Sequence, residues 1–236
     1  MCKRIICIGG GEIKSKTTIE IDRYIANLAK KHSGDKRAYG LFLGTASHDF
    51  MPYFNSFRKM YTGEFDIKAD CALLLYDKMD FSRVCEKFLK ADFIYIGGGD
   101  TVFMLETWKK CVIDKLLLDA YNRGVIICGL SAGAICYFET MYTDSEISSS
   151  GDKYNLYNGL GWLEGVCSPH YNDRVEDFHK NIIEHNIDSA YGIENDSAIV
   201  FEDGKLVGSL TSGGKSYILR NNLGVIERYE INKIKE

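Results

Sequence analysis

Short apolar segments alternate with longer amphipathic ones along the first half of the chain. The apolar segments, rich in Ile, Val and Leu, predict buried strands at residues 4–8, 38–43, 67–75, 93–96 and 125–128. The amphipathic segments predict helices at about residues 18–31, 52–61, 81–89 and 112–122. This alternation is typical of parallel strands joined by crossover helices, so we predict a layered α/β fold with a mostly parallel sheet.

The pattern changes after about residue 185, where the apolar segments become short and closely spaced. They predict four strands, at residues 199–201, 205–208, 216–219 and 225–229. Turn signals such as Asp203-Gly204 and Gly213-Gly214 separate them and favour antiparallel pairing. We therefore expect antiparallel C-terminal strands that complete the same sheet, and one domain over residues 1–236.

Composition and charge narrow the range of functions. The net charge is -4 and basic residues are interspersed with acidic ones, so no basic stripe is available for nucleic acid. No apolar run approaches the ~20 residues that span a bilayer, and the N-terminal segment has no signal-peptide core. We expect a cytoplasmic protein that binds neither nucleic acid nor membrane, and a homodimer is compatible with the sequence.

The cysteines are far apart, and no two of them form a Cys-x-x-Cys pair. Several lie within apolar runs, where a thiol packs as a small hydrophobic side chain. We therefore interpret them as reduced core residues, and we expect neither a metal nor a cofactor. The eight are Cys2, Cys7, Cys71, Cys85, Cys111, Cys128, Cys136 and Cys167.

The strand predicted at 125–128 runs into the G-x-S-x-G pattern Gly129-Leu130-Ser131-Ala132-Gly133, and a helix-compatible stretch follows at 134–140. A serine on such a strand-to-helix turn is the arrangement of a nucleophile elbow, in which small neighbours let strand and helix pack closely. The N–H of Ala132, at the start of the helix, would supply one oxyanion donor. The alternative is an ordinary turn in which Ser131 only caps the helix.

A second glycine-rich strand end lies at Gly97-Gly98-Gly99, followed by a helix that Asp100 or Thr101 would cap. If its strand neighbours the Ser131 strand, the N–H of Gly98 or Gly99 would be the other oxyanion donor. The alternative is a phosphate-binding turn, for which residues 9–11 offer a similar glycine run. Neither run continues into a complete nucleotide-binding motif.

A serine nucleophile requires a base, which is normally a histidine. His170 is favoured among the five histidines because it follows an apolar strand and Pro169 restricts the backbone just before it. Three others lie on charged, helical stretches and His48 lies in a loop. The polar segment 143–158 is predicted to be a loop over this site.

Three separated motifs together resemble the peptidase E family, which also contains cyanophycinase. They are Ile96-Gly97-Gly98-Gly99-Asp100-Thr101, Gly129-Leu130-Ser131-Ala132-Gly133-Ala134 and Pro169-His170-Tyr171. The resemblance implies a class I glutamine-amidotransferase-like (flavodoxin-like) α/β fold and a Ser-His-acid mechanism. It makes Ser131 the nucleophile, His170 the base, and Gly99 with Ala132 the oxyanion donors.

The third member of the triad departs from the family pattern. The corresponding strand end reads Gly192-Ile193-Glu194-Asn195-Asp196-Ser197-Ala198, and alignment on Ala198 places Asn195 where a glutamate is usual. A shift of this alignment by one residue would place Glu194 at the position of the usual glutamate. In an extended segment Glu194 and Asp196 project to one side and Asn195 to the other, so either a carboxylate or the amide faces His170. An asparagine can also orient a catalytic imidazole, as in Cys-His-Asn enzymes. We name Glu194 first and Asn195 second, and Asp196 is the remaining candidate.

The expected reaction is hydrolysis of a short peptide through an acyl-enzyme. The family resemblance suggests dipeptides with an N-terminal aspartate or, in a cyanophycinase-like enzyme, an aspartate-arginine polymer. Arg174 is a candidate for binding a substrate carboxylate, with a surface arginine as the alternative. A small-molecule-binding module without catalysis is the competing interpretation, while a cysteine amidotransferase is disfavoured because the turn carries serine.

Overall fold

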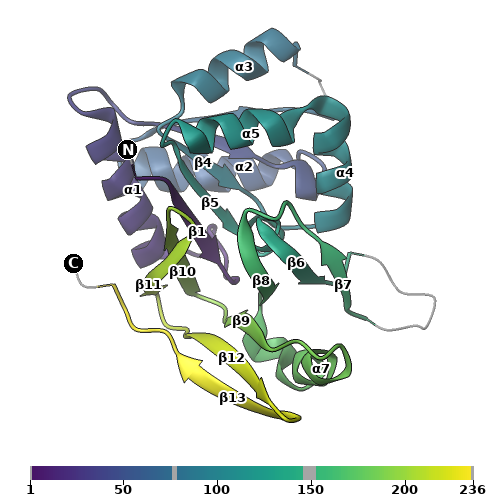
Figure 1. The fold of residues 1–236 in the computed structure, drawn as a ribbon. Coiled ribbons are helices and arrows are strands. Elements are labelled where there is room, and N and C mark those ends of the chain that lie inside the picture. Colours follow the sequence, from purple (N-terminus) through teal and green to yellow (C-terminus); the bar gives the residue numbers. More distant parts are fainter. Residues whose placement is uncertain (1, 76–78, 146–152, 235–236) are drawn as a thin grey trace.

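The computed structural model describes residues 2–75, 79–145 and 153–234 (Figure 1). A seven-stranded sheet has the strand order β11-β10-β1-β5-β4-β2-β3. The five strands β1 to β5 are mutually parallel, and β10 adds antiparallel to β1. Their bounds are β1 Arg4–Ile8, β2 Tyr39–Leu43, β3 Lys68–Ala72, β4 Phe93–Ile96, β5 Ile126–Leu130, β10 Ser197–Glu202 and β11 Lys205–Thr211.

Helices cover both faces of this sheet, which explains why its strands are apolar on both sides. Alternate residues of β1 enter different cores: Ile5 and Cys7 pack with the residues of α3, α4 and α5, whereas Ile6 and Ile8 pack with those of α1 and α2. The helices are α1 Ile19–Ser33, α2 Met51–Arg58, α3 Phe81–Lys90, α4 Thr101–Cys111 and α5 Ile113–Asn122, with short turns η1 Thr45–Ser47 and η2 Lys59–Glu64. The layered α/β fold predicted from the alternation is confirmed.

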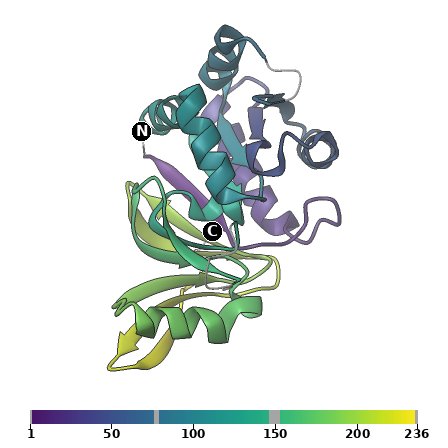
Figure 2. The same cartoon turned by 90° about the vertical axis from the view of Figure 1, so that its right-hand side faces the viewer.

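A second, six-stranded sheet has the order β13-β12-β9-β8-β6-β7, and helix α7 (Tyr171–Glu184) packs on it. In Figure 2 this sheet and α7 lie at the lower end of the molecule, away from the helices of the first sheet. The strands are β6 Phe138–Thr143, β7 Asn155–Asn158, β8 Leu163–Ser168, β9 Ser189–Ile193, β12 Ser216–Asn222 and β13 Val225–Glu230.

Two expectations about this part of the chain were wrong. Only β10 and β11 extend the first sheet, because β12 pairs with β9 and so joins β13 to the second sheet. The helix-compatible stretch predicted at 134–140 is mostly not helical, because the helix after Ser131, α6 Ala132–Ile135, is short and β6 begins at Phe138. Aromatic and β-branched side chains at 138–143 favour a strand. Phe138, Met141 and Tyr142 are buried in this strand by contacts with residues that are distant in the sequence.

The segment predicted as a loop over the site is only partly one. Residues 155–158 form β7, which pairs antiparallel with β6. Ser145 accepts hydrogen bonds from the N–H groups of Thr101 and Val102 at 2.8 and 3.3 Å, and so ties the end of β6 to the start of α4. Residues 146–152 lie outside the described residues.

All eight cysteines are free, and five of them (Cys7, Cys71, Cys128, Cys136 and Cys167) are buried, as the core interpretation predicts. Burial raises the pKa of the Cys7 and Cys167 thiols well above the usual value, which keeps them protonated and unreactive. No helix among the described residues is long and apolar enough to cross a membrane.

Candidate active site

Ser131 lies on a tight turn between β5 and α6 (Ala132–Ile135). Its backbone has φ 54° and ψ -109°, a conformation that costs a non-glycine residue energy. A Cβ on Gly129 would overlap the carbonyl of Gly133, and a Cβ on Gly133 would overlap that of Ile96. Both glycines of the pattern are therefore required for the close approach of strand and helix, and the turn presents the half-buried Ser131 at the carboxyl edge of the sheet.

His170 reaches Ser131 from the second sheet. It follows β8 and forms the N-cap of α7 with φ 48°. Its backbone N–H donates to the carbonyl of Gly9 at 2.9 Å. Nε2 of His170 lies 2.8 Å from Oγ of Ser131. The structure thus brings the two predicted residues, 39 positions apart in the chain, within proton-transfer distance.

Asn195, in the turn between β9 and β10, contacts the other side of the imidazole. Its Oδ1 lies 2.6 Å from Nδ1 of His170. Glu194 points elsewhere, since its Oε2 accepts from the N–H of Lys215 at 2.9 Å, and Asp196 accepts from the hydroxyl of Thr17. Of the three candidates at this strand end, the structure therefore places only Asn195 at His170.

Two polar side chains at the start of α7 hold Asn195. The backbone N–H of Asn195 donates to Oδ1 of Asn172 at 2.9 Å, and its side-chain Nδ2 donates to Oδ2 of Asp173 at 3.0 Å. Sequence reasoning missed both residues. Their only signal is position, because Asn172 and Asp173 follow His170 directly in the first turn of its helix.

The glycine run 97–99 lies beside the Ser131 turn, as predicted, because β4 and β5 are parallel neighbours with Ile96 opposite Gly129. A Cβ on Gly98 would lie 3.3 Å from Cβ of Ser131, and the Gly98 N–H donates to the hydroxyl of Tyr53 at 3.2 Å. Gly99 has φ 142° and packs against the carbonyl of Ala46. Asp100 caps α4 by accepting from Phe103 at 2.9 Å.

The N–H of Ala132 lies at the start of α6. The carbonyl of Ser131 accepts from Ala134 and Ile135, so the N–H of Ala132 precedes the first hydrogen bond of the helix. Such a group is available to an oxyanion that forms on a carbonyl attacked by Ser131.

The environment of His170 favours its neutral form. Burial lowers the pKa of the imidazole below its usual value of about 6.5, although the hydrogen bond to Asn195 opposes this shift. The positive charge of Arg174 lowers the pKa further, whereas the negative charges of Asp173 and Asp144 raise it. At neutral pH Nε2 is therefore free to accept a proton, as a general base must be.

Arg174, predicted to bind substrate or to lie on the surface, is buried with 7% of its area exposed. Its guanidinium lies over the ring of Tyr154 at 4.5 Å and 3.6 Å from Oδ2 of Asp144, and it also donates to the carbonyl of Tyr142. Burial excludes the surface alternative. The protein itself supplies partners for this positive charge, and the charge acts on His170 from α7.

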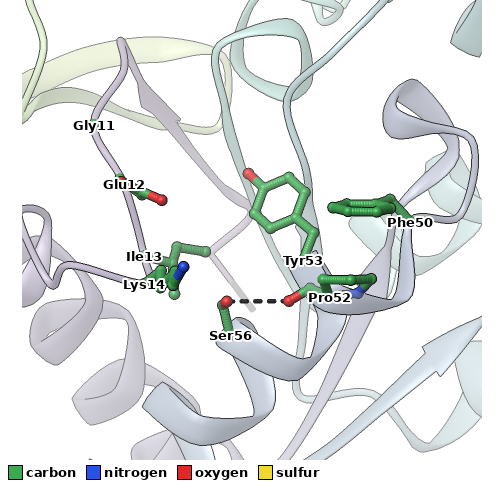
Figure 3. A pocket seen from close by; sticks show the side chains of 8 residues that line it. All are labelled: Gly11, Glu12, Ile13, Lys14, Phe50, Pro52, Tyr53 and Ser56. Carbon is green, nitrogen blue, oxygen red and sulfur yellow. Dashed lines mark hydrogen bonds between the residues drawn. The ribbon is translucent and has the colours of Figure 1, made fainter.

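A pocket of about 460 Å³ lies between the segment that follows β1 and the N-terminal part of α2 (Figure 3). One wall is the segment after β1, and it begins at Gly11, next to the glycine that contacts His170. The opposite wall includes Tyr53, whose hydroxyl bonds to Gly98. The lining is mainly apolar and consists of Gly11, Glu12, Ile13, Lys14, Phe50, Pro52, Tyr53 and Ser56.

The glycine run at 9–11 has a role that sequence reasoning did not identify. A Cβ on Gly9 would overlap the carbonyls of Ile193 and Glu194, and one on Gly10 would overlap side-chain atoms of Asn195 and His170. Gly9 and Gly10 therefore make room for the neighbouring residues of the site. This packing explains the glycine run without the phosphate-binding turn that was the alternative. Within the part of the chain that the structure describes, no group of three His, Cys, Asp or Glu side chains could hold a metal.

A doubly covered α/β sheet that ends in a serine next to an imidazole is an arrangement found in hydrolases, and comparison with known proteins places this chain among the peptidases. The chain belongs to Peptidase family S51, whose family model matches residues 5–208. The family resemblance predicted from the three motifs is thereby confirmed.

Relatives and solved structures agree with this assignment. The chain is 33% identical over 224 residues to the uncharacterized peptidase YgaJ of Bacillus subtilis, covering 91% of each protein. It is 30% identical over 166 residues to the uncharacterized peptidase Lin0382 of Listeria innocua, covering 64% of this chain and 72% of that protein.

The fold is also that of solved peptidases. It is similar to a peptidase from an acI-B1 Actinobacterium, with a TM-score of 0.76, 17% identity, and 100% of this chain and 96% of that one covered. It is similar as well to a putative peptidase E protein from Listeria monocytogenes, with a TM-score of 0.62, 19% identity, and coverage of 89% and 99%. At these identities the likeness establishes the fold.

Proposed function

We propose that this protein is a serine peptidase that hydrolyses short peptides with Ser131 as nucleophile and His170 as general base. The contact that carries the proposal is the 2.8 Å distance between Oγ of Ser131 and Nε2 of His170. The pKa of His170, lowered by burial, leaves the imidazole neutral and ready to take the hydroxyl proton. Peptidase family S51 supplies the reaction class.

The proposed reaction has two halves. Oγ of Ser131 attacks the peptide carbonyl while its proton moves to Nε2 of His170, and the imidazolium then gives that proton to the leaving amine. Water hydrolyses the acyl-enzyme by the same route in reverse. The N–H of Ala132, together with that of Gly98 or Gly99, stabilises the oxyanion. If Gly98 takes part, the substrate oxygen replaces the Tyr53 hydroxyl as its acceptor.

Asn195 takes the place of the triad acid in this proposal. Its Oδ1 accepts from Nδ1–H of His170, which keeps the proton off Nε2 and orients the ring. An amide carries no net charge, so it stabilises the imidazolium less than a carboxylate would. We therefore expect slower turnover than in a related enzyme with glutamate at this position.

For the substrate, we propose dipeptides with an N-terminal aspartate, with a cyanophycinase-like aspartate-arginine polymer as the alternative. The family resemblance supports this preference. The pocket between Gly11 and Tyr53 offers space for a substrate residue, and Tyr53 links it to the proposed nucleophile through Gly98. A panel of Asp-Xaa, Glu-Xaa, Asn-Xaa and Leu-Xaa dipeptides separates an acidic preference from an apolar one.

The central experiment is covalent labelling with a fluorophosphonate followed by peptide mapping. We expect the wild-type protein to label at Ser131 and to hydrolyse at least one dipeptide of the panel. Ser131→Ala should lose both properties, whereas Ser82→Ala, which removes an exposed hydroxyl on α3, should keep them. Unchanged hydrolysis by Ser131→Ala, or labelling at another serine, would refute the proposal. A wild-type protein that neither labels nor hydrolyses any dipeptide of the panel would refute it as well and would favour a binding module.

A further inference from the structure

The side-chain amide of Asn195 lies between two groups with opposite hydrogen-bonding demands. Its Oδ1 lies 2.6 Å from Nδ1 of His170, and its Nδ2 lies 3.0 Å from Oδ2 of Asp173. A carboxylate only accepts hydrogen bonds, so the group that faces Asp173 must be the NH2 of the amide. The opposite orientation would place the amide oxygen against the carboxylate.

The orientation of the amide in turn selects the tautomer of His170. An amide oxygen only accepts, so the Nδ1 atom that faces it must carry the proton. Nε2 is then unprotonated and faces the hydroxyl of Ser131. A reversed amide would instead direct an N–H at Nδ1 and favour the tautomer that cannot take the serine proton.

We propose that Asp173 is a positioning residue that fixes the Asn195 amide and, through it, the Nδ1–H tautomer of His170. The catalytic consequence rests on the proposed function, because it requires His170 to act as a base toward Ser131. The carboxylate of Asp173 thus carries the negative charge that a triad acid would have, but Asn195 lies between this carboxylate and the imidazole. Asp173 belongs to α7, the helix that His170 caps.

Asp173 is exposed, but two further contacts of its own, and one between Asn172 and Asn195, hold it in place. Its Oδ1 accepts from Nδ2 of Asn172 at 2.9 Å, and Oδ1 of Asn172 accepts the backbone N–H of Asn195. The N–H of Asp173 donates to the carbonyl of His170 at 2.9 Å. Asn172, Asp173 and Asn195 therefore form a closed ring of hydrogen bonds that joins the first turn of α7 to the turn between β9 and β10. The helix dipole at the start of α7 also favours a negative charge there.

The primary test compares Asp173→Ala with Glu176→Gln, which removes one negative charge from an exposed position of the same helix. We expect Asp173→Ala to lower kcat by about 10- to 100-fold, by analogy with the loss of a residue that orients a metal-binding histidine. KM should change little because Asp173 is not proposed to touch the substrate. Glu176→Gln should behave as wild type.

The pH profile adds a readout that a loss of folding would not mimic. The charges near His170 are Asp173 and Arg174 on α7 and Asp144 after β6. Removing the negative charge of Asp173 should lower the pKa of His170, so the acid limb of kcat/KM should move to lower pH in both Asp173→Ala and Asp173→Asn. It should not move in Glu176→Gln.

A charge exchange tests the coupling between the two positions. Asn195→Asp alone places two carboxylates in contact and should be strongly impaired, because both groups would be acceptors. Combining it with Asp173→Asn restores a donor facing an acceptor and puts the carboxylate at Nδ1 of His170. The double variant should therefore be more active than Asn195→Asp, and additive losses would overturn the proposal.

The imidazole tautomer can be observed without any peptidase activity, by 15N NMR of labelled protein. Wild type should show protonated Nδ1 on neutral His170, and Asp173→Ala should show a mixture of tautomers. A protein that hydrolyses no peptide but shows this change would refute the proposed function and support the role of Asp173. An unchanged tautomer, with kcat within about twofold of wild type, would refute that role.

Discussion

The backbone of Gly10 lies directly against the imidazole of His170. A Cβ at position 10 would overlap Nδ1 of this histidine as well as Oδ1 of Asn195. The neighbouring carbonyl of Gly9 accepts the N–H of His170 at 2.9 Å. The end of β1, in the first sheet, therefore forms the surface on which the histidine and its amide partner from the second sheet come together.

Gly10→Ala should impair catalysis more than folding. The added methyl group must displace the imidazole or the amide, and a shift of about 1 Å in a catalytic group can cost about 100-fold in rate. We expect a loss of that size in kcat/KM, measured with the best dipeptide of the panel. Gly63→Ala is the control, since a Cβ there meets no atom within 4 Å. Full activity of Gly10→Ala would show that the contact is not needed.

The strained turn at Ser131 predicts a difference in stability between two variants that both lack the serine hydroxyl. A residue with φ 54° and ψ -109° stores about 1–3 kcal/mol of strain, which glycine releases at the cost of a more flexible unfolded chain. Ser131→Gly should therefore be more stable than Ser131→Ala by about 1 kcal/mol in denaturant unfolding. At Ser56, within α2, Ser56→Gly should be less stable than Ser56→Ala, because glycine is the poorer helix former. Equal stability of the two Ser131 variants would argue against the strain.

Arg174 should influence the pH dependence of the reaction. Its buried positive charge lowers the pKa of His170, so removing the charge raises that pKa. In the proposed mechanism the neutral imidazole is the base, so the acid limb of kcat/KM should move to higher pH in Arg174→Met, which keeps much of the packing. Lys180→Met, on the exposed face of the same helix, should leave the limb in place. An acid limb that moves to lower pH in Arg174→Met would contradict the conclusion that the charge of Arg174 lowers the pKa of His170.

Asp22 predicts a pH-dependent stability that is independent of the site. This carboxyl is fully buried on α1, where it accepts from the hydroxyls of Tyr61 and Thr18 at 2.7 Å each. Burial raises its pKa to about 6. Between the unfolded value of about 4 and this folded value, the folded state binds the proton more tightly. The stability that Asp22 contributes is thus present below pH 4 and is lost as the pH rises through 6.

Asp22→Asn removes this titration. Its free energy of unfolding, relative to wild type, should grow by about 3 kcal/mol between pH 4 and pH 7 and then stay constant. Urea unfolding at a series of pH values measures the difference. Asp35→Asn, at an exposed position after α1, is the matched control and should show no such trend. A difference that shrinks with rising pH would show that folding lowers the pKa of Asp22 instead of raising it.

Much of the first sheet could be predicted from local patterns. Strands buried on both faces are continuous apolar runs, and the helices between them have one apolar face, so both kinds of element are evident in a short window of sequence. The turn at Ser131 is equally local, since Gly129 and Gly133 stand within two residues of the serine. The choice of His170 among five histidines also depended only on its immediate neighbours.

The second sheet could not be predicted in the same way. Its strands are short, and segments such as 138–143 are compatible with a helix until their aromatic side chains meet partners distant in the chain. The pairing of β12 with β9, rather than with the first sheet, depends on contacts between segments that no local pattern encodes.

The partner of His170 was undecided for a related reason. Consecutive residues of an extended chain face opposite sides, so a shift of one position exchanges Glu194 for Asn195. Which of them meets the imidazole depends on how the turn between β9 and β10 sits against the first turn of α7. Only the packing of these elements brings Asn195, and behind it Asp173, to the histidine, because the carboxylate of Glu194 is turned toward the N–H of Lys215.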